Sequence, residues 1–195
     1  MEERLTPELV LYGYRHGYFP MAESIRGKEI FWYDPDPRAI LPLESFHVSR
    51  NLAKLVRQGR FEVVSDRAFE EVIRACADRR STWISEEIIR VYTELHDAGY
   101  AHSIECYQEG TLVGGLYGVA LGGAFFGESM FHRVRDASKV ALVHLVRRLR
   151  ENGFVLLDTQ YSTPHLEQFG LIEIPRIEYK RRLREALKVQ ASWNG

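Results

Sequence analysis

Two polar residues end an apolar run late in the sequence. The segment LLDTQ places Asp158 and Gln160 directly after two leucines. Residues two apart on a strand share a face, so the carboxylate and the amide would point the same way. A carboxylate can orient a neighbour or accept a proton, and an amide oxygen can accept a hydrogen bond from an amine. The pair indicates a reactive site; the structural alternative is an aspartate held in a helix cap or a salt bridge.

The segments that precede this pair must position it. LVGGLYG, GAFFGESMF, DASKVAL and LLDTQ follow one another between residues 112 and 160. They predict two glycine-marked strands, a loop, a helix and a final strand. The polar pair at the end of that strand would therefore face a glycine-rich strand pair.

The rest of the main domain also alternates between helix and strand. Helices are predicted after Asp66, after Ser85 and after Asp136, where each polar side chain would cap the first turn, and from Pro175. A helix is also expected around residues 50–57. Strands are predicted at 102–107, 111–121, 124–129 and 154–158, with a hairpin turn at 108–110. This α+β order, a mixed sheet flanked by helices, is similar to that of the acetyltransferase (GNAT) superfamily.

Acetyl-CoA is not expected as the acyl donor. Acetyltransferases bind a pyrophosphate on a glycine-rich turn before the central helix. The corresponding residues here, 131–136, read FHRVRD and contain no glycine. We therefore expect a different acyl donor on a similar scaffold.

The first residues differ from the main domain in composition. Residues 1–36 are expected to form a small N-terminal module and residues 37–195 the main domain. A short helix at 9–14 would end at Gly17, and the prolines at 35 and 37 oppose regular structure there. The module is rich in aromatic side chains, which either pack internally or line a cleft against the main domain.

The overall composition narrows the function classes. The chain has 195 residues, 45% of them hydrophobic, and a formal net charge of −1, so a nucleic-acid partner would have to meet a local basic patch. Cys76 and Cys106 lie far apart and show no metal-ligand spacing, so no metal, cofactor or disulfide is expected. No apolar run could span a membrane, and no heptad pattern demands a partner. We expect a soluble, cytoplasmic monomer.

Ordered motifs extend along nearly the whole sequence. They are GYFP, DPDPRAILP, FHVSRNL, TWI, AHSIE, LVGGLYGVALGGAFFGESMF, DASK and LLDTQ. With these motifs the sequence resembles the leucyl/phenylalanyl-tRNA–protein transferases. Enzymes of that family move leucine or phenylalanine from aminoacyl-tRNA to the N-terminal amine of proteins that begin with arginine or lysine. The product then enters N-end-rule degradation.

The resemblance also implies roles for individual residues. The catalytic pair would be Asp158 and Gln160, with no covalent intermediate, and Asp158 would orient the amide before it would transfer a proton. Trp83 would stack on the terminal adenine of the tRNA, opposite Met21, where many relatives have tryptophan. The apolar pocket for leucine, phenylalanine or methionine would be formed by Leu116, Phe125, Met130, Leu142, Leu145 and Leu157.

Other contacts to substrate are predicted from the chemistry of residues in and around these motifs. Glu128 would bind the acceptor amine or its basic side chain, and Ser129 belongs to the same GESMF wall. Gly114, Gly115 and Gly127 would let the backbone approach the acyl group. His132 replaces a serine found in many relatives and has no assigned role. The tRNA body would meet one of the basic clusters Arg50–Lys54–Arg57, Arg79–Arg80, Arg147–Arg148 and residues 180–184.

Two alternatives remain open at this point. A transferase with changed specificity could move arginine onto acidic N-termini, although arginine would need a buried acid in its pocket. A non-catalytic RNA-binding module could keep the fold, although the complete Asp158–Gln160 pair and the GESMF motif argue against it.

Overall fold

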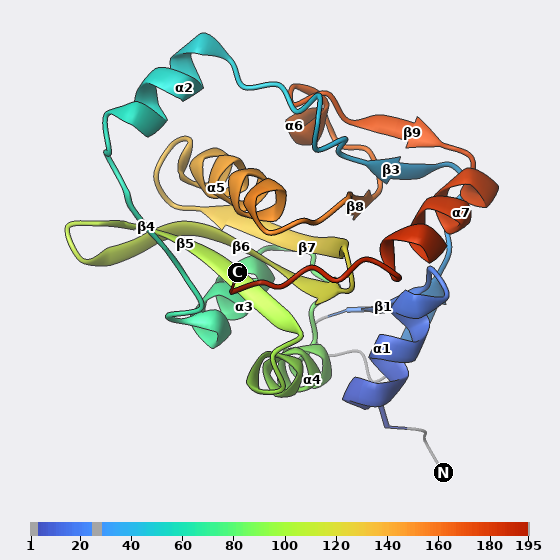
Figure 1. Cartoon of the computed structure of the whole chain (residues 1–195). Coiled ribbons are helices and arrows are strands. Elements are labelled where there is room, and N and C mark those ends of the chain that lie inside the picture. Colours follow the sequence, from blue (N-terminus) through green and yellow to red (C-terminus); the bar gives the residue numbers. More distant parts are fainter. Residues whose placement is uncertain (1–3, 25–28, 195) are drawn as a thin grey trace.

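A seven-stranded sheet forms the centre of the molecule. The computed structural model describes residues 4–24 and 29–194. The strands of the central sheet are β3 (Arg38–Ile40), β4 (Glu62–Ser65), β5 (Ala101–Gln108), β6 (Thr111–Leu121), β7 (Ala124–His132), β8 (Leu156–Gln160) and β9 (Ile172–Ile174). Their order in space is β4-β5-β6-β7-β8-β3-β9 (Figure 1). A separate pair consists of β1 (Phe19–Ala22) and β2 (Ile30–Tyr33).

The sheet is mixed. Strands β7 and β8 run parallel, while the other neighbouring strands in the described ranges run antiparallel. The parallel pair needs a crossover, which a long helix supplies. Strand β3, from early in the chain, lies between β8 and β9 from late in the chain.

Helices cover both faces of the sheet. They are α1 (Pro7–Arg15), α2 (Arg50–Arg57), α3 (Phe69–Ala77), α4 (Glu86–Asp97), α5 (Ala137–Glu151), α6 (Pro164–Glu167) and α7 (Arg176–Ala186). Buried side chains of α1, α3, α4 and α7 form one apolar cluster on the sheet, and those of α2 and α5 form another with Trp193. Figure 1 shows α5 above the sheet and α3 and α4 below it. The predicted α+β architecture, a mixed sheet flanked by helices, is confirmed.

The predicted helix starts differ in how they are capped. The Ser85 hydroxyl accepts a hydrogen bond from the backbone N–H of Ile88, as expected for the cap of α4. Asp66 and Asp136 were expected to cap α3 and α5, and both expectations are wrong. Both aspartates adopt left-handed backbone conformations, with φ of 57° and 68°, and neither helix has a side-chain cap. Two backbone N–H groups just before α3 instead donate to Glu105 from β5.

Several strand limits also differ from the prediction. Strand β7 continues three residues past Ser129, to His132, and β8 begins at Leu156 and runs to Gln160. Residues 34–37 form no helix or strand, as the prolines predicted. The strands that flank these prolines, β2 and β3, were not predicted.

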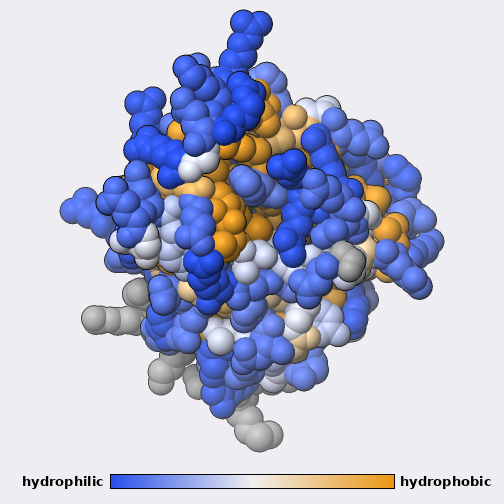
Figure 2. Space-filling model, turned by 60° about the vertical axis from the view of Figure 1, so that its left-hand side comes forward, coloured by the Kyte–Doolittle hydropathy of each residue, from blue (hydrophilic) through white to orange (hydrophobic). Residues whose placement is uncertain are grey.

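The face of the molecule shown in Figure 2 is mostly hydrophilic. On the face shown in Figure 2, a strip of hydrophobic surface lies among hydrophilic side chains. None of the helices in the described ranges is long and apolar enough to cross a membrane. Both cysteines are free and buried, and burial raises the pKa of each thiol to about 12, so neither is poised to react.

Candidate active site

A cavity of about 510 Å³ opens between the β1–β2 pair, the middle of the sheet and the start of α5. Most of the side chains predicted from the motifs to bind substrate line it. These are Trp83, Leu116, Gly127, Glu128, Ser129, Met130, Leu142, Leu145 and Leu157. Gln160 of the predicted catalytic pair also lines the cavity. Among these predicted residues, Trp83 and Gln160 are 77 positions apart in the sequence, and the fold brings them to one cavity.

One wall of the cavity is apolar. It is formed by Leu116 of β6, Met130 of β7, Leu142 and Leu145 of α5, and Leu157 of β8. Such a wall suits a leucine, phenylalanine or methionine side chain, because burial of these groups is worth about 1.5–3 kcal/mol each.

Phe125 lies outside this wall, although it was predicted to belong to the pocket. Its ring is fully buried and stacks on Trp193 with 5.5 Å between ring centroids. The ring also covers Gly118, where an added side chain would collide with it. Phe125 therefore supports the sheet from the α5 side.

Gly127 has a different role from the other two motif glycines. A Cβ added at Gly127 would lie 3.5 Å from the carbonyl oxygen of Asp158, an ordinary contact, so its missing side chain leaves the cavity open. At Gly114 an added Cβ would collide with Ala137, and at Gly115 with the carbonyl oxygen of Ile104. The latter two glycines permit close packing and do not line the cavity.

Asp158 is sealed inside an ion pair. Its Oδ1 and Oδ2 accept hydrogen bonds from Nε (3.0 Å) and Nη2 (2.7 Å) of Arg38, and both side chains have 0% exposure. The Tyr179 hydroxyl donates to Oδ2 at 2.7 Å, and the backbone N–H of Gln160 donates to Oδ1 at 2.9 Å. Burial opposes the charge of Arg38, yet the Asp158 carboxylate raises the pKa of Arg38 above its usual value. Asp158 therefore faces Arg38, and it is absent from the cavity lining.

Gln160 connects this ion pair to the cavity. Its backbone adopts φ of 59°, in the left-handed region, which costs a non-glycine residue about 1 kcal/mol. Its Nε2 donates a hydrogen bond of 3.0 Å to Oε1 of Glu128. The amide is thus fixed from both ends, by Asp158 at its backbone and by Glu128 at its side chain.

Glu128 is held by tyrosines instead of arginine. The Tyr92 hydroxyl donates to Oε2 of Glu128 at 3.4 Å, and the Tyr14 hydroxyl is hydrogen-bonded to that of Tyr92. Enclosure by protein raises the pKa of Glu128 to about 8, with the negative charge of Asp158 adding to the effect and hydrogen bonds from the tyrosines opposing it. Burial and the charge of Glu128 raise the pKa of Tyr14 and Tyr92. Glu128 can therefore exchange a proton near neutral pH.

Trp83 and Met21 also line the cavity. The backbone N–H of Ala22 in β1 donates to the carbonyl oxygen of Trp83 at 3.1 Å, which joins the strand pair to the TWI segment. Arg79 lies beside them, and its Nη2 donates to Ser129 Oγ (2.9 Å) and to the carbonyl oxygen of Met130 (3.2 Å).

Some site residues were missed from the sequence. Arg38 was part of the DPDPRAILP motif but was given no role, although a charged residue next to an apolar run can indicate a buried ion pair. Tyr14 and Tyr92 carried no local signal, because their hydroxyls meet across 78 positions of sequence. His132, left without a role, lines the cavity with its Nδ1 3.4 Å from Ser138 Oγ.

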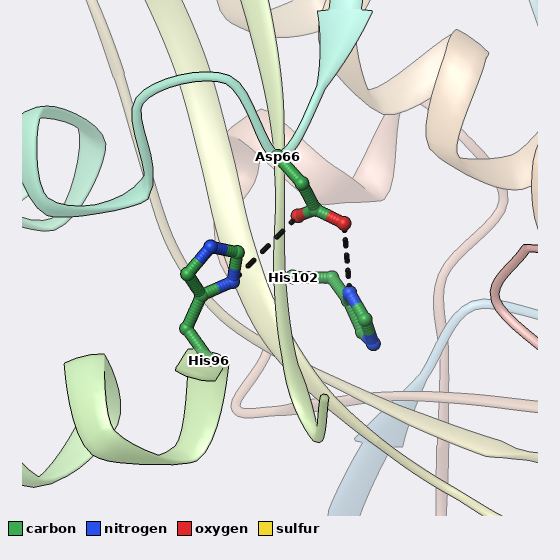
Figure 3. Close-up of side chains that lie close together, drawn as sticks. All are labelled: Asp66, His96 and His102. Carbon is green, nitrogen blue, oxygen red and sulfur yellow. Dashed lines mark hydrogen bonds and ion pairs between the residues drawn. The ribbon is translucent and has the colours of Figure 1, made fainter. Parts of the chain in front are cut away.

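A second cluster, Asp66, His96 and His102, groups potential metal ligands (Figure 3). His102 Nδ1 bonds Asp66 Oδ2 at 2.9 Å and its Nε2 faces the carbonyl oxygen of Gly99 at 3.2 Å. His96 Nδ1 bonds the carbonyl oxygen of Ala101 at 2.8 Å. These nitrogens are engaged in contacts within the protein. The cluster therefore links the end of α4 to the β4–α3 connection.

An apolar slot that ends at a fixed amide and a titratable carboxylate has the features needed to hold an apolar acyl group beside an attacking amine. Comparison with known proteins is more specific. Residues 40–184 match the family model of leucyl/phenylalanyl-tRNA protein transferase, and residues 3–36 match the model of its N-terminal domain. The chain belongs to the leucyl/phenylalanyl-tRNA–protein transferase family, and it is an aminoacyltransferase.

Individual relatives are similar over nearly the whole chain. The leucyl/phenylalanyl-tRNA–protein transferase of Salinibacter ruber is 60% identical over 99% of this chain and 85% of the relative. That of Gloeobacter violaceus is 62% identical over 94% of both chains. The family resemblance inferred from the motifs is thereby confirmed, and nothing supports the non-catalytic alternative. The solved structure of L-PGS from Bacillus licheniformis is similar over 67% of this chain and 49% of that chain, with 14% identity and a TM-score of 0.46.

Proposed function

We propose that this protein transfers leucine, phenylalanine or methionine from aminoacyl-tRNA to the N-terminal amine of proteins that begin with arginine or lysine, and so marks them for N-end-rule degradation. The observation that carries the proposal is the apolar wall that ends at Gln160 and Glu128. Because such a wall separates apolar side chains by only about 1–3 kcal/mol, several apolar donors are expected.

The reaction needs little more than positioning. The neutral amine attacks the carbonyl carbon of the aminoacyl ester, a C–N bond forms, the bond to the tRNA oxygen breaks, and the amine proton ends on that oxygen. The Gln160 carbonyl oxygen accepts a hydrogen bond from the attacking amine, since its Nε2 is already engaged by Glu128. Glu128, with a pKa of about 8, binds the basic side chain of the acceptor or transiently accepts the amine proton before it reaches the tRNA oxygen.

Asp158 acts on Gln160 without touching substrate in this proposal. The Asp158 carboxylate is fully buried, is paired with Arg38 at 2.7 Å and does not line the cavity, so it has no direct contact with an amine bound there. Asp158 instead accepts a hydrogen bond from the backbone N–H of Gln160. This bond holds the Gln160 backbone in its left-handed conformation and so positions the side-chain amide. This pairing supports the orienting role over proton transfer.

In this proposal, Trp83 and Met21 contact the terminal adenine. Both line the cavity, and an aromatic ring on a base is worth about 1–3 kcal/mol. Met21 would contact the base less selectively than a second ring.

The body of the tRNA would lie along α2. Arg50, Lys54 and Arg57 are exposed, and within the described ranges no carboxylate pairs with them. By contrast, Arg147 is paired with Glu151, and Arg181 and Arg182 are paired with Glu178. Binding should weaken strongly with salt, because phosphate contacts release counterions.

The proposal also covers the scaffold, the domain boundary, the oligomeric state and the location of the enzyme. We propose a GNAT-like scaffold, a domain boundary after residue 36, and action as a monomer in the cytoplasm. The order of helices and strands and the match of separate family models to 3–36 and 40–184 support the first two.

The direct test is the mass of a peptide after incubation with charged tRNA. Leucyl-tRNA should add one leucine to peptides that begin with Arg or Lys, and none to peptides that begin with Asp or Met. Gln160→Ala should abolish the gain while the protein stays folded. No gain with leucyl-, phenylalanyl- or methionyl-tRNA would refute the proposal, and a gain with arginyl-tRNA on the Asp peptide would establish the changed-specificity alternative.

A further inference from the structure

Three aromatic rings form a shelf at the mouth of the cavity. The rings of Tyr33 and Tyr161 each lie 5.9 Å from the ring of Phe19, one stacked and one edge-on. Tyr33 is 37% exposed and Tyr161 is 45% exposed, whereas Phe19 is buried beneath them. We refer to Phe19, Tyr33 and Tyr161 as the aromatic shelf.

The aromatic shelf is continuous with the active site. Phe19 and Tyr161 both line the cavity, and Tyr161 directly follows Gln160. Tyr33 is paired across from Phe19 in the β1–β2 register, so both side chains lie on the same face of that strand pair. A chain that leaves the cavity past Gln160 therefore meets the aromatic shelf within one or two residues.

The charges around the aromatic shelf do not suit a nucleic acid. Lys180 pairs with Asp34 at 2.6 Å, and Arg176 lies 3.9 Å from both Asp34 and Asp36. Arg38, beneath Phe19, is paired with Asp158. Each of these cations is neutralised by a carboxylate, so none is left to bind phosphate, which single-stranded nucleic acids require beside a stacking ring.

An apolar surface beside an acidic site suits the acceptor polypeptide. Resting on the proposed function, we infer that the aromatic shelf binds the second and third residues of the acceptor and favours aromatic or large aliphatic side chains there. The N-terminal basic residue is held at Glu128, and the next residue reaches Tyr161, because consecutive Cα atoms are about 3.8 Å apart. The aromatic shelf would thus make the enzyme selective for the residues that follow the N-terminal residue of the acceptor.

Peptide binding and transfer are measured separately to test this. Affinities of fluorescent Arg-Phe, Arg-Leu and Arg-Gly peptides are determined by anisotropy, and kcat and KM are determined with leucyl-tRNA. The wild type should prefer Arg-Phe to Arg-Gly on the order of tenfold. Tyr161→Ala and Tyr33→Ala should reduce that preference to less than about threefold, through KM for the peptide, and Tyr161→Phe should retain it.

Tyr12→Ala is the matched control. Tyr12 is 60% exposed and packs on His16, away from the cavity, so its removal should leave the preference unchanged. Equal wild-type affinity for Arg-Phe and Arg-Gly would overturn the inference, as would a Tyr161→Ala variant that raises KM for leucyl-tRNA instead of the peptide. A peptide preference that depends on the tyrosines without any transfer would uphold the shelf and refute only the proposed function.

Discussion

Asp158 and Glu128 lie on neighbouring strands of one sheet, and their surroundings differ. Asp158 has a guanidinium at 2.7 Å, a tyrosine hydroxyl and a backbone N–H, with no exposure to the cavity. Glu128 has an amide and a tyrosine hydroxyl, faces the cavity, and has a pKa raised to about 8. The first carboxylate is therefore held by an ionic partner, whereas the second has neutral partners and a raised pKa. The comparison separates a positioning carboxylate from a reactive one.

Removal of the ionic partner should have the largest effect. Arg38→Met leaves Asp158 buried beside Tyr179 without a counterion, which should lower the free energy of unfolding by about 3–5 kcal/mol. Urea denaturation followed by circular dichroism measures this. The double variant Arg38→Met with Asp158→Leu should recover most of the loss, because an apolar pair carries no stranded charge. A loss below about 1 kcal/mol in the single variant would show that the pair is not sealed from water.

Glu128→Gln should affect activity more than stability. We expect transfer to fall about 100-fold, since a titrating group is lost from the site. Between the unfolded pKa of 4.5 and the folded pKa of about 8, the folded wild type binds more protons than the unfolded chain. Wild-type stability should therefore fall as pH rises through that window, and the variant should not show this fall.

The prediction for Glu128 is checked by the pH dependence of unfolding in the wild type and in Glu128→Gln. Unfolding is measured for both proteins at several pH values between about 5 and 9. The acceptor amine also titrates near pH 8, so the rate of the variant should still rise with pH, but less steeply than that of the wild type. Parallel stability curves would show that Glu128 titrates as an ordinary exposed glutamate.

A third carboxylate, Asp66, extends the comparison to a smaller effect. Burial alone would raise its pKa, but hydrogen bonds from His102 and from the backbone N–H of Ser103 lower the pKa below its usual value. Its contribution to stability is present above the unfolded pKa of 3.8 and is lost as pH falls through the lowered folded value. Asp66→Asn should cost about 1–2 kcal/mol at neutral pH, with less difference in acid, and should leave transfer unchanged.

Asp97→Asn is the matched variant for this prediction. Asp97 is exposed at the end of α4, and no ion pair is found for it in the described part of the chain. Thermal unfolding should be the same as that of the wild type at every pH. A loss of transfer in Asp66→Asn would indicate that the cluster in Figure 3 is coupled to the cavity.

The sequence predicted those elements whose signals are local. The helix after Ser85 and the 111–121 strand follow from a cap, from periodicity and from turn residues within a few positions. Strands β3 and β9, of three residues each, depend on partners more than 100 positions apart. Short strands of this kind carry too few residues to show a period.

The site was predictable to the extent that motifs encode it. Nine of the ten predicted substrate-binding residues line the cavity, and Phe125 does not. The error arises because an apolar residue on a strand beside the site has the same pattern whether it faces the cavity or the core. The Arg38–Asp158 pair spans 120 positions, so no local pattern could link the two residues. From the sequence, the structural alternative to a reactive aspartate is a salt-bridged one. Asp158 does form such a salt bridge, whereas Gln160 faces the cavity.

The position of β3 has a consequence for synthesis on the ribosome. Residues 38–40 emerge early, yet both of their strand partners, 156–160 and 172–174, are made in the last quarter of the chain. Until then Arg38 has no carboxylate partner, and the cavity lacks the wall formed by Leu157 and Gln160. A prematurely ended chain that lacks β8 and β9 would therefore also lack the Arg38–Asp158 pair and Gln160. The cavity wall that contains Gln160 is therefore completed only when translation is nearly complete.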